Sequence, residues 1–364
     1  MKLSSITSFL ENKAPLSSQE SYDNSGLIVG NPEMEVNGVL LSLDCTEDIV
    51  DEALALGVNL IIAHHPIVFK GLKKLNGKNY VERTVIKAIK NDIAIYAIHT
   101  NLDNYQYGVN HEIGKRLGLV NLKILAPKSE ELVKLVVFVP KENVDDVSKA
   151  LFEAGAGNIG EYKECSFESE GTGAFKPTGK ANPVVGKLNE REFVTESRVE
   201  VICSKHHLGK VLAAMNNAHP YEEVAHDIIP LLNNNQDEGA GMIGELIQET
   251  DVLTFLKEVK NTFNCGVIKY TKSEKEKVKK VAFCGGSGAF LIQKAKSKGA
   301  DIYITGDIKY HEFFDGEKDM VITDIGHYES EQFTPKLIHA VLTKKFTTFA
   351  VHLSKVNTNP INYL

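Results

Sequence analysis

Residues 39–66, VLLSLDCTEDIVDEALALGVNLIIAHHP, predict a strand, a helix and a second strand in immediate succession. The apolar runs 38–44 and 59–66 have the length and composition of buried strands. The segment 46–57 between them begins with a threonine suited to a helix N-cap and ends with a glycine suited to a helix stop. Two apolar strands joined by a helix indicate parallel pairing, so this stretch predicts an α/β sheet covered on both faces.

A second stretch follows the same plan. VAFCGGSGAFLIQKAKSKGADIYITGDI begins at Val281, and the two stretches align at a constant offset. Gly57 then meets Gly299, and the strand 60–63 meets the strand 302–305. Both stretches have the order strand, helix, glycine, strand and polar end. We interpret them as a weak internal repeat.

The chain between the repeats has a different pattern. Its expected elements are the strand 134–140, the helix 143–155, the strand 198–204, the helix 207–218 and the strand 224–231, with a polar, Gly- and Lys-rich stretch at 166–183. Two β-α-β halves of this size indicate a ferredoxin-like α+β unit. A polar stretch at 231–241 is expected to be the linker that leaves this unit. We therefore predict an α/β domain made of two similar halves, 1–125 and 237–364, interrupted by an insert domain at 126–236.

Composition limits the class of protein. The chain of 364 residues carries a net charge of -7, which argues against non-specific nucleic-acid binding. Its five cysteines include no CxxC pair and are expected to be reduced thiols. The first residues, MKLSSITSFLENKAP, lack the apolar region of a signal peptide, and no run approaches the length of a membrane span. We expect a cytoplasmic protein without a membrane partner.

Histidines and carboxylates follow three of the predicted strands. The strand 60–63 is followed by His64 and His65, the next strand by HTNLD (99–103), and a late strand by GHYESE (326–331). In open α/β sheets, ligands bind outside the carboxyl ends of the strands. These side chains are therefore expected at one crevice, although they come from both halves of the repeat.

Imidazoles and carboxylates together suit a metal site. Neutral imidazole binds zinc, iron, nickel and copper, and a carboxylate can bridge two ions. His327 and Glu331 are four residues apart and share one face if that turn is helical. The candidate ligands are His64, His65, Asp103, His327 and Glu331. Five ligands exceed the need of one tetrahedral ion, which favours a two-metal site.

Each signal alone has a simpler interpretation. A histidine pair before a proline is more often core or turn packing, and Asp103 fits an Asx-turn in a Gly- and Asn-rich loop. His327 fits a helix N-terminus, and Glu331 fits a solvated helix carboxylate. From spacing alone, the metal and non-metal interpretations both stay open. In the insert we favour a non-metal interpretation of His206, His207, His219 and His226.

Two further segments lie at strand ends. The turn CGGSGAF (284–290) offers backbone amides that could cradle a phosphate, although a plain strand-helix turn explains it as well. Asp307, Lys309 and His311, in TGDIKYHE, are candidates for substrate binding or proton transfer, with ordinary loop polarity as the alternative.

The motifs in combination resemble the family of GTP cyclohydrolase I type 2 homologues, the NIF-three-like proteins. The resemblance rests on HHP (64–66), HTNLD (99–103), GHYESE (326–331), DNSGLIVG (23–30) and TGDIKYHE (305–312). It extends over nearly the whole chain. The insert, with NIGEYKECSF and AHPYEEVAHDIIPL, resembles the PII- or CutA-like insert of the longer bacterial members.

The resemblance implies a dinuclear centre of two divalent cations per subunit. Zinc is expected, with manganese or iron as alternatives. The five candidate ligands named above match the family motifs, and Glu331 is assigned over its rival Glu329 by its spacing from His327. The resemblance also implies a toroidal homohexamer with the metal sites facing an internal cavity and the insert at its openings.

Two functions are carried forward. The first is a metal-dependent hydrolase acting on a nucleotide or a phosphorylated small molecule, with His99 or His311 as general acid or base. GTP cyclohydrolase chemistry itself does not follow from these residues. The second is a non-enzymatic metal-binding or regulatory protein whose PII-like insert senses a small-molecule ligand or a partner.

Overall fold

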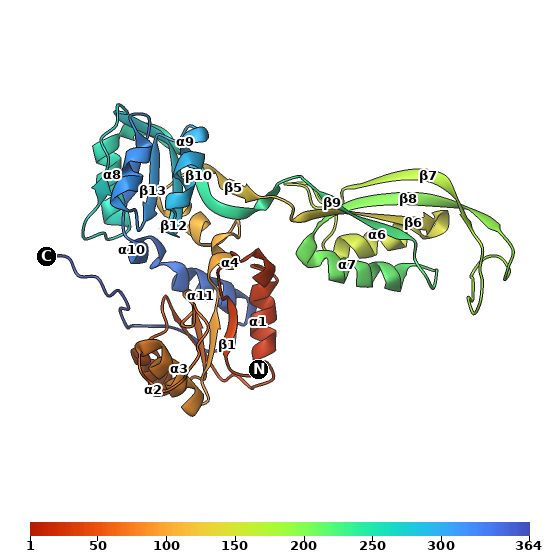
Figure 1. Ribbon diagram of the computed structural model, residues 1–364, viewed down its shortest axis with the longest axis horizontal. Helices are drawn as coiled ribbons and strands as arrows, with labels where there is room; N and C mark the ends of the chain where they lie inside the picture. Colours follow the sequence, from red (N-terminus) through yellow and green to blue (C-terminus); the bar gives the residue numbers. More distant parts are fainter. The chain divides into compact units, whose positions relative to one another are not determined.

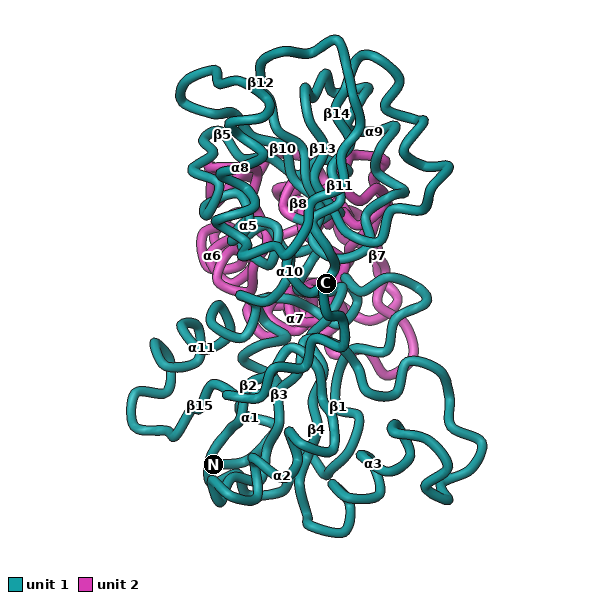
Figure 2. Tube along the Cα trace, turned by 90° about the vertical axis from the view of Figure 1, so that its left-hand side faces the viewer, with its two compact units in different colours: residues 1–126, 238–364 teal, residues 127–237 magenta.

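The computed structural model describes residues 1–364, which form two compact units (Figures 1 and 2). Unit 1 combines Met1–Ala126 with Glu238–Leu364, and unit 2 is Pro127–Asp237. The chain therefore leaves unit 1 once, builds unit 2 and returns. No helix has the length and the apolar character needed to cross a membrane.

The first sheet of unit 1 is mainly parallel. Its strands in spatial order are β1 (Gly26–Val29), β4 (Ala94–Ala97), β3 (Leu60–Ala63), β2 (Val39–Ser42) and β15 (Val351–Leu353). Only β1 runs antiparallel to its neighbour β4. All four residues of β2, β3 and β4 are buried, which explains why these strands appear in the sequence as continuous apolar runs.

Helices cover both faces of this sheet. On one face, Ile61 packs with residues of α2 (Glu47–Leu56) and α3 (Tyr80–Lys90). On the other, Ile62 packs with residues of α1 (Leu3–Glu11) and α11 (Thr334–Lys345). Neighbouring residues of β3 thus serve opposite cores, and each fully buried aliphatic side chain contributes about 1.5–3 kcal/mol.

The second sheet of unit 1 has six strands. In spatial order they are β11 (Lys269–Tyr270), β14 (Val321–Asp324), β13 (Ile302–Gly306), β12 (Lys277–Ser287), β10 (Asn235–Asp251) and β5 (Val120–Lys128). The central strands β12, β13 and β14 are parallel, while β10 and β11 run antiparallel to their partners. The remaining helices of unit 1 are η1 (Leu16–Ser18), α4 (Thr100–Asp103), α5 (Val109–Arg116), α8 (Val252–Thr262), η3 (Ala289–Leu291), α9 (Ile292–Ser297), η4 (Tyr310–Gly316) and α10 (His327–Glu331).

The proposed repeat corresponds to two β-α-β segments in unit 1. β2, α2 and β3 form the first, and β12, η3–α9 and β13 form the second, each with a parallel strand pair. Gly57 and Gly299 occupy the left-handed region at the end of their helices, with φ of 68° and 70°. The aligned glycines therefore have the same conformational role.

Unit 2 is a four-stranded antiparallel sheet with two helices on one face (Figure 1). Its elements are β6 (Leu132–Pro140), η2 (Lys141–Asn143), α6 (Val144–Glu153), β7 (Ser166–Phe175), β8 (Glu192–Ser204), α7 (Lys205–Ala218) and β9 (His226–Leu231). The strand order is β7-β8-β6-β9, with antiparallel pairs throughout.

Two segments differ from the sequence expectation. The stretch expected to be a linker at 231–241 includes the first part of β10, and the polar stretch at 166–183 contains β7. β7 is an edge strand whose side chains are almost all exposed. The backbone of each segment pairs with a strand that is remote in the sequence. Neither segment therefore has to show the alternating apolar pattern by which a half-buried strand is recognised.

Candidate metal centre

Side chains that follow three strands converge inside unit 1. His64 and His65 follow β3, and His99 follows β4 as the residue that precedes α4. After β14, a turn through Gly326 starts α10 at His327. The ends of parallel strands from both sheets therefore supply one site, as expected from the rule for ligand sites in α/β sheets.

The turn before α10 requires a glycine. Gly326 has φ of 94°, and a Cβ at this position would lie 2.1 Å from the Oε2 atom of Glu329. A side chain here would push Glu329 aside and strain the backbone. The glycine thus lets α10 start directly beyond the strand, which brings His327 and Glu331 to the site.

The two adjacent histidines are oriented through their Nδ1 atoms. His64, which is fully buried, donates from Nδ1 to the carbonyl oxygen of Ile98 over 2.8 Å. His65 donates from Nδ1 to Oδ1 of Asp44, also over 2.8 Å. Because the Nδ1 side of each ring faces an oxygen acceptor, Nε2 is the nitrogen that can bind a metal once it carries no proton, which is the usual arrangement of a ligating histidine.

The other two histidines of the site are held in the same way. His99 donates from Nδ1 to Asp23 and His327 from Nδ1 to Asp307, each over 2.7 Å. Burial acts to raise the pKa of Asp23, but the hydrogen bond and charge of His99 hold it well below its usual range. Four imidazoles thus have an oxygen acceptor behind them.

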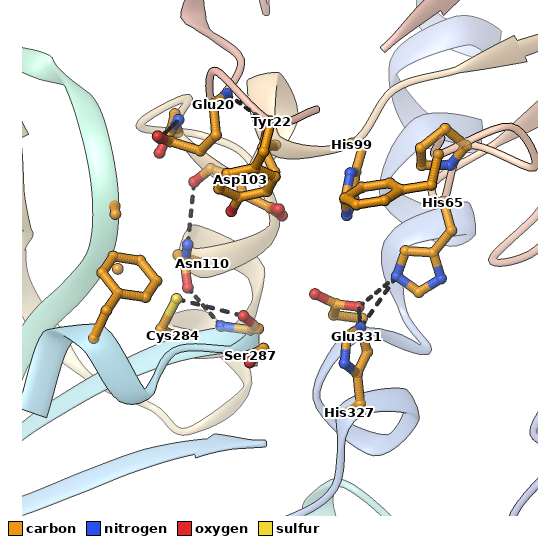
Figure 3. Close-up of a pocket in the computed structure, with 18 residues that line it drawn as sticks. Glu20, Tyr22, His65, His99, Asp103, Asn110, Cys284, Ser287, His327 and Glu331 are labelled. Carbon is orange, nitrogen blue, oxygen red and sulfur yellow. Dashed lines mark hydrogen bonds and ion pairs between the residues drawn. The ribbon is translucent and has the colours of Figure 1, made fainter. Parts of the chain in front are cut away.

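Glu331 lies at the centre of the cluster (Figure 3). Its Oε2 atom is 3.0 Å from Nε2 of His65 and 3.1 Å from Nε2 of His327. Its Oε1 atom is 3.8 Å from Nε2 of His64. The two oxygens of one buried carboxylate therefore face different histidines.

Two buried atoms of the cluster have no hydrogen-bond partner. They are Nε2 of His64 and Oδ1 of Asp103, which lie 3.6 Å apart. Leaving buried polar atoms unsatisfied costs about 1–3 kcal/mol each. A cation bound between a nitrogen lone pair and a carboxylate oxygen would satisfy both. The donor set therefore fits a metal ion on geometry alone.

The ligand atoms form three groups that could each hold an ion. Within each group they lie within 4.8 Å of one another. The groups are His65, His327 and Glu331; His64, Asp103 and Glu331; and His64, His65 and His99. The first two groups share Glu331, so it is the carboxylate placed between them. Asp103 was expected in a loop, but it is the last residue of α4 and belongs to one of these two groups.

The protonation of the cluster reflects close packing of its charges. Burial acts to raise the pKa of Glu331, but hydrogen bonds from His327 and His65 hold it well below its usual range. Burial acts to lower the pKa of His65 and His327, but their carboxylate partners raise them to about 9 and about 11. Burial and the charge of Glu331 raise the pKa of Asp103. In the metal-free cluster the carboxylates thus hold protons on His65 and His327, and divalent cations would take the place of those protons.

A cavity of about 340 Å³ adjoins the cluster. Figure 3 shows Tyr22 and Cys284 on its walls together with the histidines and carboxylates. Its lining includes three aromatic rings, those of Tyr22, Phe69 and Phe290, but no lysine or arginine. The metal-ligand groups therefore open onto a small chamber with apolar rings and carboxylates in its wall.

The glycine-rich turn lines this cavity but its amides are occupied. Gly285 donates to Asn110, Gly286 to Ser330 and Gly288 to Thr305, over 2.9–3.0 Å. The helix that follows starts as the three-residue turn η3. These three amides are therefore not free to bind a phosphate, because side-chain oxygens already accept from them.

The other strand-end candidates are Asp307, Lys309 and His311, and they do not all belong to the site. Asp307 accepts from His327 and so supports the cluster. The backbone of Lys309 is capped by Glu312, and its side chain is exposed. His311 is exposed on η4, stacks on Phe314 and does not line the cavity.

The four insert histidines are absent from the potential metal-ligand groups. The rings of His206 and His207 lie with their centroids 4.0 Å apart and their planes tilted by 57°. His219 bonds through Nε2 to the carbonyl oxygen of Phe138, and His226 bonds to that of Val224.

Sequence reasoning missed the carboxylates behind the histidines. Asp44 ends the predicted strand 38–44 and lies two residues beyond β2, and Asp23 lies in DNSGLIVG before β1. Both were within quoted segments, but only Asp44 carried a signal, as an acidic residue beyond a strand end. Nothing in the sequence pairs Asp44 with His65, because that pairing depends on how β2 and β3 align.

Comparison with known proteins identifies relatives over the full length. The family model of Duf34/NIF3 (NGG1p interacting factor 3) matches residues 1–360. A Staphylococcus epidermidis protein named GTP cyclohydrolase 1 type 2 homolog is 37% identical over 367 residues, covering 100% of both chains. A Halalkalibacterium halodurans protein of the same name is 40% identical, covering 99% of this chain and 98% of its own.

Solved structures agree with these relatives. A Bacillus cereus protein related to NIF3 superposes with a TM-score of 0.87 at 40% identity, covering 100% of this chain and 99% of the other. A Staphylococcus aureus protein superposes with a TM-score of 0.78 at 31% identity, with the same coverage. The mixed α/β architecture with several sheets is thus shared with NIF3-related structures, as the motifs predicted.

Proposed function

This chain belongs to the Duf34/NIF3 family, and on that premise we propose that it is a dinuclear metal-dependent hydrolase of a nucleotide or another small phosphorylated molecule. One observation carries the proposal. Nε2 of His64 and Oδ1 of Asp103 are buried without partners, beside a glutamate shared by two ligand groups. Such a cluster is costly as a purely structural element and becomes favourable with cations bound.

The two ions would be held by groups that share Glu331. His64 and Asp103 complete one group, and His65 and His327 complete the other. Divalent ions would supply Lewis-acid activation of water and of a phosphoryl oxygen. Zinc suits this mixture of imidazole and carboxylate donors, and manganese or iron would also be accepted.

His99 is the better of the two proposed acid–base residues. It lines the cavity, and Asp23 holds its Nδ1 atom. Its Nε2 atom is therefore available to take or give a proton in the cavity. His99 also belongs to a possible ligand group with His64 and His65, so ligation is its competing role. His311 lies outside the cavity.

The cavity wall limits the form of the substrate. Tyr22 and Phe69, whose ring centroids are 6.2 Å apart, offer apolar faces to a planar base. Because no lysine or arginine lines the cavity, a phosphate there would rely on the metal ions for charge neutralisation. This chemistry favours a small nucleotide or sugar phosphate.

A regulatory role is the second candidate, and unit 2 offers one observation for it. The strand order and the two helices of unit 2 support the proposed ferredoxin-like, PII- or CutA-like insert. A cavity of about 890 Å³ lies in this unit, with Phe138, Phe175 and Tyr221 among its lining residues. A ligand bound there would fit a sensor. The expected homohexamer remains a prediction, tested by sedimentation.

The test begins with protein purified without chelator. Two ions per chain by elemental analysis, with turnover of a nucleotide panel lost on chelation and restored on reloading, would support the hydrolase. His65→Ala and Asp103→Ala should lose metal and turnover without unfolding the sheet. His226→Ala removes an exposed histidine of unit 2 and is the matched control. Unchanged metal content in both site variants would refute the ligand assignment.

A further inference from the structure

Residues 354–363 pass from the first sheet of unit 1 to α10. They follow β15, which pairs with β2, and near the end of the chain Tyr363 contacts Glu329 of α10. Near the start of this segment, the hydroxyl of Ser354 donates to Glu52, and the backbone amide of Lys355 donates to the same carboxylate. The segment is therefore anchored on α2 before it reaches the metal-ligand cluster.

The segment then contacts the carboxylate behind His65. The hydroxyl of Thr358 donates to Oδ2 of Asp44 over 2.6 Å, while Oδ1 of Asp44 accepts from Nδ1 of His65 over 2.8 Å. Both oxygens of Asp44 are thus engaged. A carboxylate held at both oxygens cannot rotate freely, so it fixes the plane of the imidazole that it supports.

The far end of the segment contacts the other half of the cluster. The hydroxyl of Tyr363 donates to Oε1 of Glu329 over 2.9 Å, and Glu329 lies on α10 between His327 and Glu331. The ring of Tyr363 lies where a Cβ on Gly266 would be 2.3 Å from it. This end is therefore packed against the second half of unit 1.

The two ends of the segment matter because the ligands are divided between the halves. His64, His65 and Asp103 come from the first half of unit 1, while His327 and Glu331 come from the second. We infer that residues 354–363 act as a strap that positions His65 through Thr358 and Asp44 and ties it to α10. Thr358 is thus a positioning residue for metal binding. This inference rests on the proposed metal site.

Cobalt(II) titration of the full chain tests the strap. The visible absorption spectrum of bound cobalt(II) reports its coordination geometry. The titration gives the affinity for the metal without any assay of turnover. Thr358→Val keeps the shape but removes the hydroxyl, and it should weaken binding of one ion about ten-fold and alter the spectrum. Thr358→Ser should restore both. Thr348→Val makes the same chemical change at an exposed site and is the control.

The outcomes separate the strap from the proposed function. If the unaltered protein binds cobalt and Thr358→Val matches the Thr348→Val control in affinity and spectrum, the strap is refuted while the metal site stands. If the unaltered protein binds no cobalt, both proposals fail. Two other results would also refute the positioning role of Thr358. One is a loss of metal affinity that Thr358→Ser does not restore. The other is a loss of affinity that accompanies a lower unfolding temperature of the metal-free protein. Tyr363→Phe should weaken binding in the same direction from the other end.

Discussion

Metal binding to this protein should release protons even in alkaline buffer. The perturbation is the addition of cobalt(II) to chelator-treated, dialysed protein at pH 8. Carboxylate partners raise the pKa of His65 to about 9 and that of His327 to about 11. Both imidazoles must lose a proton from Nε2 before this nitrogen can bind a metal.

The expected number of protons follows from these values. At pH 8, His327 is fully protonated and His65 is about nine-tenths protonated, so binding should release about two protons per chain. The raised pKa of Asp103 acts in the same direction. Ordinary histidines, with a pKa of about 6.5, would release almost none at this pH. The apparent affinity should therefore rise about a hundred-fold per pH unit between pH 6 and 8.

Isothermal titration calorimetry in two buffers of different ionisation enthalpy measures the number directly. Asp44→Asn removes a charge that raises the pKa of His65, so the count should fall towards about one. Asp48→Asn removes an exposed carboxylate from the first turn of α2 and is the matched control. A count near zero for the unaltered protein at pH 8 would refute the charge arrangement derived for the cluster.

Three further outcomes are expected. Asp103→Asn should lower the metal content from two ions to one, because the His65, His327 and Glu331 group stays intact; elemental analysis showing two ions would contradict this division. Phe69→Ala should weaken binding of a nucleoside monophosphate to the metal-loaded protein by about 1–3 kcal/mol in calorimetry, and an unchanged affinity would exclude stacking. Phe283→Ala should lower the free energy of unfolding by about 3–5 kcal/mol in a denaturant titration, whereas a loss below about 1 kcal/mol would contradict its fully buried position.

The central strands of unit 1 could be predicted from the sequence because they are buried on both faces. β3 and β4 appear as apolar runs ended by polar residues, and the structure confirms them within a few positions. β7 could not be predicted this way, since its side chains are almost all exposed. The strand β10 was also missed, because glycine and acidic residues around Glu238 resemble a linker.

The candidate site could likewise be predicted from the sequence only in part. The strand-end rule placed His64, His65 and His99 at one crevice, and the four-residue spacing of His327 and Glu331 matches the helix α10. The rule concerns position relative to a strand, which the local sequence records. It does not say which oxygen lies behind which nitrogen, because that depends on packing between segments that are remote in the chain.

Thr358 illustrates why such partners escape sequence reasoning. Its hydroxyl bonds to Asp44, which is 314 residues away, and Asp44 in turn bonds to His65. No periodicity or spacing encodes this chain of contacts. These contacts nevertheless bear on metal binding. The ligands come from two halves of a repeat, so the geometry of the metal site depends on the distance between those halves. Glu331 spans that division within the cluster, and the segment 354–363 spans it outside, so the same two halves are joined at the ligands and again behind them.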